Sequence, residues 1–206
     1  HDALPIYLSL AIQDLKYVQE AHIVSVNNEC KELLLILGHN TVAAENIPIH
    51  CINLQMKDGR NTEPTGQFFT FTREQEQSSS NEYTDTLDKY LYEPNASILK
   101  AGAFRNVACI YKVKKLHPNS HLYTSGEPIK NFPGRSFRIT GICTLNKKEL
   151  KSVLGDLKKA NITVRNFPSS VAELRKRIKL SEGGEVYLFA TTLINEQKVL
   201  IRCEKI

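Results

Sequence analysis

The chain has 206 residues, of which 41% are hydrophobic and 24% are charged. This is an ordinary globular composition, with room for one large domain or two to three small ones. The sequence contains no apolar run of the roughly 18 residues needed to span a membrane and no basic-then-apolar secretory signal. Its five cysteines are odd in number and never form a C-x-x-C pair, which argues against a disulfide framework and a cysteine-type zinc site. We interpret them as reduced thiols of a cytoplasmic protein.

The net charge of +5 is distributed very unevenly along the chain. Residues 1–99 contain six Lys and Arg against fourteen Asp and Glu, a net charge of −8. Residues 100–206 contain twenty-one against eight, a net charge of +13. A half this basic attracts polyanions, because neutralised phosphates release condensed counterions. The alternative is that the lysines only keep the domain soluble; we favour contact with nucleic acid.

The chain opens with a segment that matches nothing downstream. Residues 1–7 resemble the translated read-through of a sequencing adapter. We therefore interpret residues 1–7 as a non-native leader on a truncated reading frame, and we expect the true N-terminal region to lie upstream.

The next segments predict the end of an α/β sheet. The apolar run 21–26 is typical of a buried strand in a parallel sheet. Asn27 or Asn28 can cap a helix over 29–38 that ends at Gly38. Strands are expected at 47–54 and 67–72, joined through turns at Gly59 and Gly66, and the polar, Ser-rich segment 74–81 is expected to be a linker.

The middle of the chain is expected to be largely helical. A helix is predicted over 83–92, and Pro94 interrupts it. Asn95 can cap a second helix that runs through Val107, where apolar residues recur at helical spacing. Residues 119–124 are expected to be extended.

From Gly134 onward the pattern predicts a compact α+β module of order β-α-β-α-β-β, with helices on one face of the sheet. Strands are expected at 135–143 and 162–166, followed by a hairpin of 185–193 and 197–205 after a turn at Gly183-Gly184. One helix begins after Asn146, with Glu149 in the manner of a capping box, and a second begins at Ser170 with Glu173 in the same arrangement.

Five strings along the chain are specific enough to suggest a family. They are VNNECKELL at 26–34, YEPNASILKAGAF at 92–104, HPNSHLYTS at 117–125, FPGR at 132–135 and VRNFPSSVAELRK at 164–176. Together they resemble a family of Bacteroidetes-type class I S-adenosylmethionine (SAM)-dependent methyltransferases. Those proteins combine a Rossmann-like catalytic domain, a ferredoxin-like segment and a C-terminal THUMP-like domain.

The resemblance implies both domain boundaries and a missing part. Residues 8–80 would be the C-terminal part of the Rossmann-like methyltransferase domain, 82–125 the ferredoxin-like segment and 128–206 the THUMP-like domain. A class I methyltransferase binds its cofactor on a Gly-rich turn after the first strand, and no such turn occurs here. We therefore expect SAM to be the cofactor of the full-length parent, whereas these 206 residues alone bind no SAM, are inactive and contain no catalytic residue.

The residues that we expect to contact RNA are the basic side chains of the C-terminal module. They are Arg135, Arg138, Lys147, Lys148, Lys151, Lys158, Lys159, Arg165, Arg175, Lys176, Arg177 and Lys179. Each could equally belong to a solvated helix face, and Arg135, Arg138 and Arg165 could instead pair with acids. Phe167 could stack on an unpaired base, although a core position is the alternative that we favour. His117 and His121 are four residues apart, but Pro118 places them in a loop without further ligands, so we expect no metal there.

Three functions remain open from the sequence. The first is an RNA-modifying methyltransferase, represented here by the end that binds tRNA or rRNA. The second is a stand-alone RNA-binding or adaptor protein without catalysis. The third is a methyltransferase of a non-RNA substrate with an incidental basic surface. A membrane partner is not expected, and the oligomeric state is left open.

Overall fold

A computed structural model of the chain describes residues 4–56, 65–155 and 157–206, with the backbone alone at residues 4–7. The chain divides into two compact units: the first comprises residues 1–81 and 94–111, and the second comprises residues 82–93 and 112–206. The predicted turn at Gly59 and residues 1–3 of the predicted leader lie outside the described residues, whereas residues 4–7 begin helix α1 (Leu4–Asp14).

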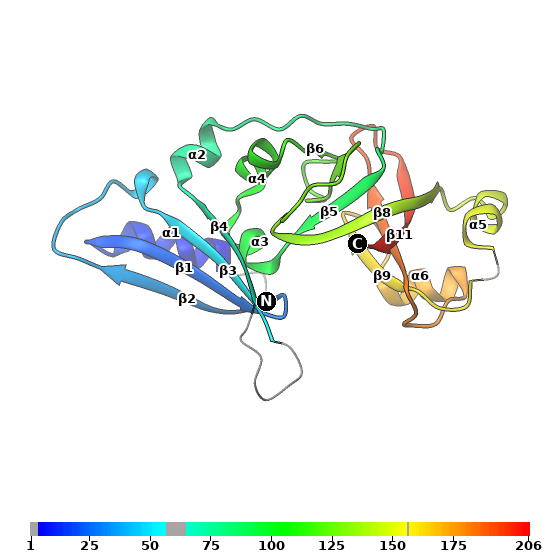
Figure 1. Cartoon of the computed structure of the whole chain (residues 1–206), viewed down its shortest axis with the longest axis horizontal. Helices are drawn as coiled ribbons and strands as arrows, with labels where there is room; N and C mark the ends of the chain where they lie inside the picture. Colours follow the sequence, from blue (N-terminus) through cyan, green and yellow to red (C-terminus); the bar gives the residue numbers. More distant parts are fainter. Residues whose placement is uncertain (1–3, 57–64, 156) are drawn as a thin grey trace. The chain divides into compact units, whose positions relative to one another are not determined.

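The first unit is built on a four-stranded mixed sheet of order β2-β1-β3-β4 (Figure 1). Its strands are β1 (Val18–Val26), β2 (Glu29–Leu37), β3 (Ile49–Gln55) and β4 (Thr65–Phe71), with a short 3-10 helix, η1 (Ala44–Asn46), before β3. Strands β1 and β3 are parallel neighbours, and the antiparallel strands β2 and β4 flank them. The predicted strands at 21–26, 47–54 and 67–72 are thus confirmed, and so is the parallel pairing.

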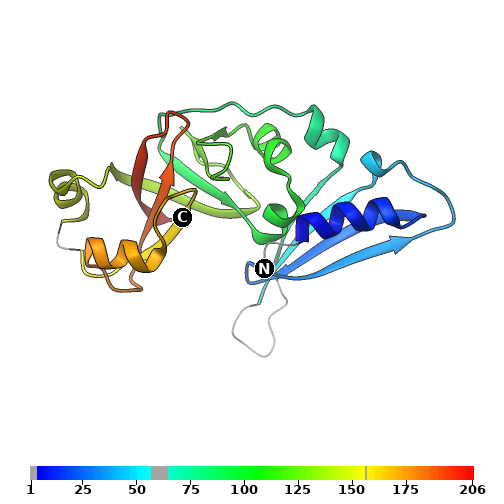
Figure 2. The same cartoon turned by 180° about the vertical axis from the view of Figure 1, so that it is seen from behind.

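The two faces of this sheet differ. Alternate residues of β1 and β3 are almost fully buried, among them Ala21, Ile23 and Cys51. Helix α1 runs along one face of the sheet (Figures 1 and 2) and itself buries Leu8 and Ile12. The opposite face carries partly exposed residues, both polar and apolar. Cross-strand pairing places on this face His22, Leu34, Ile36, His50 and Phe68.

The prediction of a helix over 29–38 is wrong, because this segment forms strand β2 in an antiparallel hairpin with β1. Asn27 and Asn28 form the turn and both have positive φ, 49° and 64°. Two consecutive left-handed residues make the tight turn whose twist matches a β-hairpin, and Asn tolerates that conformation better than most residues.

The prediction of a linker over 74–81 is also wrong. A helix, α2 (Arg73–Ser78), begins after Thr72 with a full capping box to Gln75. The carboxylate of Glu76 then accepts the backbone N–H groups of residues 104–106 at 2.8–3.1 Å. These are the free donors of the first turn of helix α4 (Phe104–Tyr111), so Glu76 caps that helix.

Asn95 caps a helix as predicted, but this helix is shorter than expected. Its side chain accepts from the backbone N–H of Ile98 at the start of α3 (Ala96–Ala101). The helix stops at Gly102, whose φ of 79° is readily available only to glycine. The chain then re-enters helix as α4.

The second unit is built on a seven-stranded sheet of order β6-β7-β5-β8-β11-β10-β9. Its strands are β5 (Tyr90–Pro94), β6 (Lys114–Lys115), β7 (Tyr123–Ser125), β8 (Gly134–Cys143), β9 (Asn161–Arg165), β10 (Val186–Thr192) and β11 (Lys198–Lys205). The predicted helix over 83–92 is therefore wrong, because residues 83–89 are not helical and β5 follows. The predicted extended segment at 119–124 overlaps β7.

From Gly134 the predicted order β-α-β-α-β-β is confirmed, with α5 (Lys147–Leu154) and α6 (Val171–Ile178) between the strands. Asn146 caps α5, but Glu149 bonds Thr144 instead of closing the predicted box. The box of Ser170 with Glu173 is complete.

The sheet of the second unit has a hydrophobic core on each face. Both helices pack on one face, where their apolar residues meet Cys143, Ala190 and Leu200. The alternating residues Phe189 and Ile201 point the other way and join a separate core, which contains Leu91, Leu116 and Leu122 from the chain before β8. Among the described residues, no helix of either unit is long and apolar enough to cross a membrane.

Candidate nucleic-acid interface

Nine of the twelve basic residues expected to contact RNA are exposed at the surface of the second unit. They are Arg138, Lys147, Lys148, Lys151, Lys158, Lys159, Lys176, Arg177 and Lys179. The nearby carboxylate of Glu173 closes the capping box of α6 with Ser170, and that of Glu149 accepts hydrogen bonds from Thr144; these bonds lower the pKa of each carboxyl. Both carboxyls therefore remain ionised at neutral pH, and the nine exposed cations outnumber them.

Three of these lysines are brought together from distant positions in the sequence; we call Lys158, Lys159 and Lys179 the lysine group. Lys159 forms an isolated bridge with Ser181, and the backbone N–H of Ser181 donates to the carbonyl of Lys158 at 2.9 Å. Lys179 is the left-handed C-cap of α6, two residues before Ser181. The pairing therefore places the three ammonium-bearing residues at one end of α6, where the helix dipole also favours cations.

Arg135 and Arg165 are placed differently, because both pair with the buried carboxylate of Glu93. The side chain of Glu93 is 2% exposed. Arg135 Nε donates to one carboxylate oxygen at 2.8 Å, its terminal nitrogen contacts the same oxygen, and Arg165 meets the other oxygen at 2.8 Å. The Arg135 guanidinium also lies over the rings of Phe137 and Phe189. One buried acid from the acidic half of the sequence thus neutralises half the charge of this arginine pair.

Arg175 is also partly engaged. It donates to the carbonyl of Ala160 at 3.2 Å and lies 3.8 Å from the exposed carboxylate of Glu182. Its first role is therefore to join α6 to the chain before β9.

A pocket of about 570 Å³ lies near the start of α6, at the end opposite the lysine group. Its volume is in the range of small-molecule sites. It is lined by His117, Asn119, Val164, Asn166, Phe167, Pro168, Thr192, Glu196 and Lys198. The lining combines an aromatic ring, amide and imidazole groups and one charge of each sign.

A network of hydrogen bonds holds the polar groups of this pocket. The backbone N–H of Asn119 donates to His117 Nδ1 at 3.0 Å, and the Asn166 amide contacts the same nitrogen at 2.9 Å. His117 Nδ1 is therefore the acceptor, and Nε2 faces the carboxylate of Glu196 at 3.4 Å. Thr192 Oγ1 donates to the carbonyl of Asn166 at 2.6 Å, which secures that residue at a φ of 50°. The pocket wall is thus fixed before any ligand arrives.

Two of the pocket residues, Phe167 and His117, were already candidates from the sequence. Phe167 lines the pocket and also packs against the core under α5 and α6, so both of its expected roles are compatible with its position. His117 is a pocket residue, and His121 is a separate, largely buried residue whose pKa is lowered to about 4, first by burial and then by Lys115 and Arg165. No signal in the sequence pointed to Asn166, whose contact with His117 arises only in the folded chain.

The class of protein follows from two family models that match adjacent segments. Residues 90–133 match a ferredoxin-like domain and residues 134–205 match a THUMP domain-like model. The chain therefore carries a ferredoxin-like domain followed directly by a THUMP-like domain. The ferredoxin-like match includes α3 and α4, which belong to the first unit.

Among solved structures, the chain is similar to the crystal structure of a "putative methyltransferase" from Porphyromonas gingivalis W83. The two are 44% identical with a TM-score of 0.85, over 96% of this chain and 48% of the other. The chain thus spans about half the length of that protein, and the predicted resemblance to Bacteroidetes methyltransferases is confirmed. No curated protein sequence matches the chain.

Proposed function

We propose that this chain is the C-terminal part of a SAM-dependent methyltransferase that modifies RNA, and that its THUMP-like domain holds the RNA. Methyl transfer from SAM to a base or ribose would take place on the part of the parent that this chain does not include. The observation that carries the RNA assignment is the presence of a preformed polar and aromatic pocket and the exposed lysine group on the same compact unit.

Each feature suits a different part of an RNA strand. The exposed lysines can neutralise phosphates without reading sequence. The pocket can receive an unpaired base, which would stack on Phe167 and exchange hydrogen bonds with the Asn166 and His117 side chains. Helix α6 has eight residues and spans about 12 Å between the two features. A single strand could therefore reach both.

The first unit suits the role of a terminal part of a Rossmann-like methyltransferase domain. The parallel pair β1 and β3 is the pairing that such a sheet contains. The sequence has no Gly-rich strand-to-helix turn to receive the cofactor. We therefore expect the first unit alone not to bind SAM.

The test is an electrophoretic shift of the full chain with total tRNA and with rRNA fragments at several salt concentrations. We expect binding that weakens steeply with salt. The triple variant Lys158→Gln, Lys159→Gln, Lys179→Gln should lower the slope of log affinity against log salt by about 2, since each phosphate contact on a single strand contributes roughly 0.7. A control that removes equal charge elsewhere, Lys16→Gln, Lys130→Gln, Lys205→Gln, should leave the slope close to that of the unmodified chain.

The pocket is tested separately with Phe167→Leu, which keeps an apolar side chain in the core but removes the stacking surface. Loss of one base-stacking contact costs about 1–3 kcal/mol, or roughly five- to a hundredfold in affinity. An unchanged affinity for single-stranded RNA would remove the pocket from the proposal. Absence of any RNA binding by the full chain would instead favour a methyltransferase of another substrate.

A further inference from the structure

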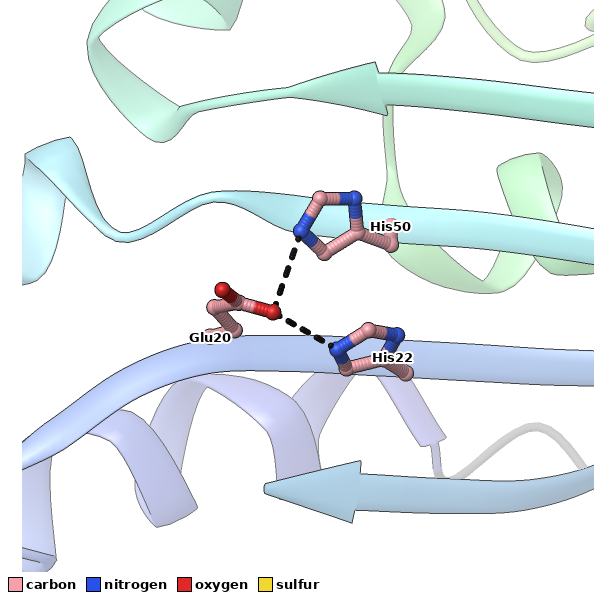
Figure 3. Close-up of side chains that lie close together, drawn as sticks. All are labelled: Glu20, His22 and His50. Atoms are coloured by element: carbon pink, nitrogen blue, oxygen red, sulfur yellow. Dashed lines mark hydrogen bonds and ion pairs between the residues drawn. The ribbon is translucent and has the colours of Figure 1, made fainter. Parts of the chain in front are cut away.

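Three side chains with metal-binding atoms converge on the more open face of the sheet in the first unit (Figure 3). Glu20 and His22 are two residues apart on β1, so both point to the same face. His50 lies on β3 as the direct parallel neighbour of His22. Strand β2 lies between β1 and β3 in the sequence. The three side chains therefore come together only through the parallel register of β1 with β3.

The distances suit a small ion. Glu20 Oε2 lies 3.0 Å from His22 Nε2 and 3.6 Å from His50 Nε2. Ligand atoms about 2.0–2.1 Å from a tetrahedral zinc ion are about 3.3 Å apart, midway between these two distances. The two imidazole rings are stacked with centroids 4.6 Å apart and an interplanar angle of 27°. A metal ion could therefore contact all three residues after small side-chain adjustments.

The neighbouring residues hold the imidazoles as metal ligands are commonly held. His50 Nδ1 hydrogen-bonds with Thr70 Oγ1 at 2.9 Å, and Thr70 is the cross-strand neighbour of His50 on β4. Such a bond to the far ring nitrogen orients Nε2 towards a metal. The side chains are 24–46% exposed, so an ion can reach them from solvent.

We propose that Glu20, His22 and His50 form a binding site for a divalent transition-metal ion, with Zn²⁺ as the ion that two imidazoles and a carboxylate fit best. The site lies apart from the THUMP-like domain and does not depend on RNA binding. Three protein ligands leave one tetrahedral position open for water or for a group from a partner. The bound ion would join β1 to β3.

The experiment is a calorimetric titration of Zn²⁺ into the full chain, with any polyhistidine tag removed. We expect one ion per chain, and visible absorption bands of tetrahedral geometry when Co²⁺ replaces Zn²⁺. His22→Gln, His50→Gln and Glu20→Gln should each raise the Kd at least about tenfold, as even the loss of an outer partner of a metal ligand costs 10–100-fold. Mg²⁺ should not compete, because it prefers oxygen ligands in octahedral geometry.

The matched control is His39→Gln, which removes an exposed histidine of the same unit outside the cluster. It should bind Zn²⁺ with the Kd of the unmodified chain. Circular dichroism of all four variants checks that each is folded. The proposal is overturned if the folded chain shows no saturable Zn²⁺ binding, or if binding survives unchanged in the three cluster variants. Neither result bears on RNA binding, which is measured in the absence of added metal.

Discussion

The sheets of the two units differ in how their faces are used. The seven-stranded sheet of the second unit has a hydrophobic core on both faces, one beneath α5 and α6 and the other around Phe137, Phe189 and Ile201. The four-stranded sheet of the first unit buries one face, while the other exposes Phe68 at 66%. A sheet with a core on both faces is stabilised by packing on both sides. The more open sheet leaves one face accessible to ligands and charged groups.

The largest expected effect comes from one phenylalanine on each sheet. Phe189 is fully buried and meets Phe137 edge-on at 4.9 Å. Phe189→Ala should lower the free energy of unfolding of the second unit by about 4 kcal/mol, through lost burial and the cavity left behind. Phe68→Ala should change the stability of the first unit by no more than about 0.5 kcal/mol. Urea unfolding measures both, and a larger effect at Phe68 would mean that its face is covered.

The next effect concerns the buried charge of the second unit. Glu93→Ala removes the carboxylate between Arg135 and Arg165 and leaves two partly buried guanidinium groups without a counter-charge. The free energy of unfolding should fall by about 3 kcal/mol, at the lower end of the range for broken buried pairs because both arginines retain some exposure. Glu196→Ala, at a carboxylate with 77% exposure, is the control and should have little effect. If the two variants unfold alike in urea, the Glu93 pairing adds nothing to stability.

The smallest effect is a dependence of stability on pH. The folded pKa of His121 is about 4, against 6.5 for the ordinary ring. Between pH 6.5 and 4 the unfolded chain takes up a proton that the folded chain does not, so stability falls as the pH is lowered. We expect a loss of about 1–2 kcal/mol, because the partial exposure of the ring screens the charge.

His121→Asn should remove this component of the pH dependence. Asn accepts the φ of 52° found at this position. His39→Asn, at an exposed histidine, should retain it. Thermal unfolding curves recorded across this pH range for the three proteins provide the comparison, and identical pH profiles would contradict the burial of His121.

The same contrast explains what could be predicted from the sequence. The order of elements after Gly134 was predicted correctly because the helices carry local signals, such as the Ser170 and Glu173 capping box, and the strands alternate clearly. In the first unit the run Leu33-Leu34-Leu35 suits a helix and a strand equally. The segment forms a strand because Asn27 and Asn28 adopt the left-handed conformation of a tight hairpin turn. Helix α2 was not predicted, because it buries no apolar residue and only the Thr72 and Gln75 capping box marks it in the sequence.

The candidate sites were harder to predict, since each depends on contacts between distant segments. The basic character of the C-terminal half is visible in composition, yet the engagement of Arg135 and Arg165 depends on Glu93, which lies far before them in the sequence. His117 meets Asn166 and Glu196 only through the folded sheet. The Glu20, His22 and His50 cluster depends on the register of β1 with β3, which no local pattern specifies.

The boundary between the two matched families falls inside one continuous sheet. Strand β5 is next to β8 in the strand order, and the backbone N–H of Ile139 on β8 donates to the carbonyl of Lys89, the residue just before β5. A truncated protein that begins at residue 134 would lack the strand that neighbours β8, and the core around Phe137 would be exposed to water. We expect such a protein to aggregate during expression. The segment that folds as one unit is therefore longer than the THUMP-like match. An enzyme that acquired this module by recombination would need the preceding strands as well.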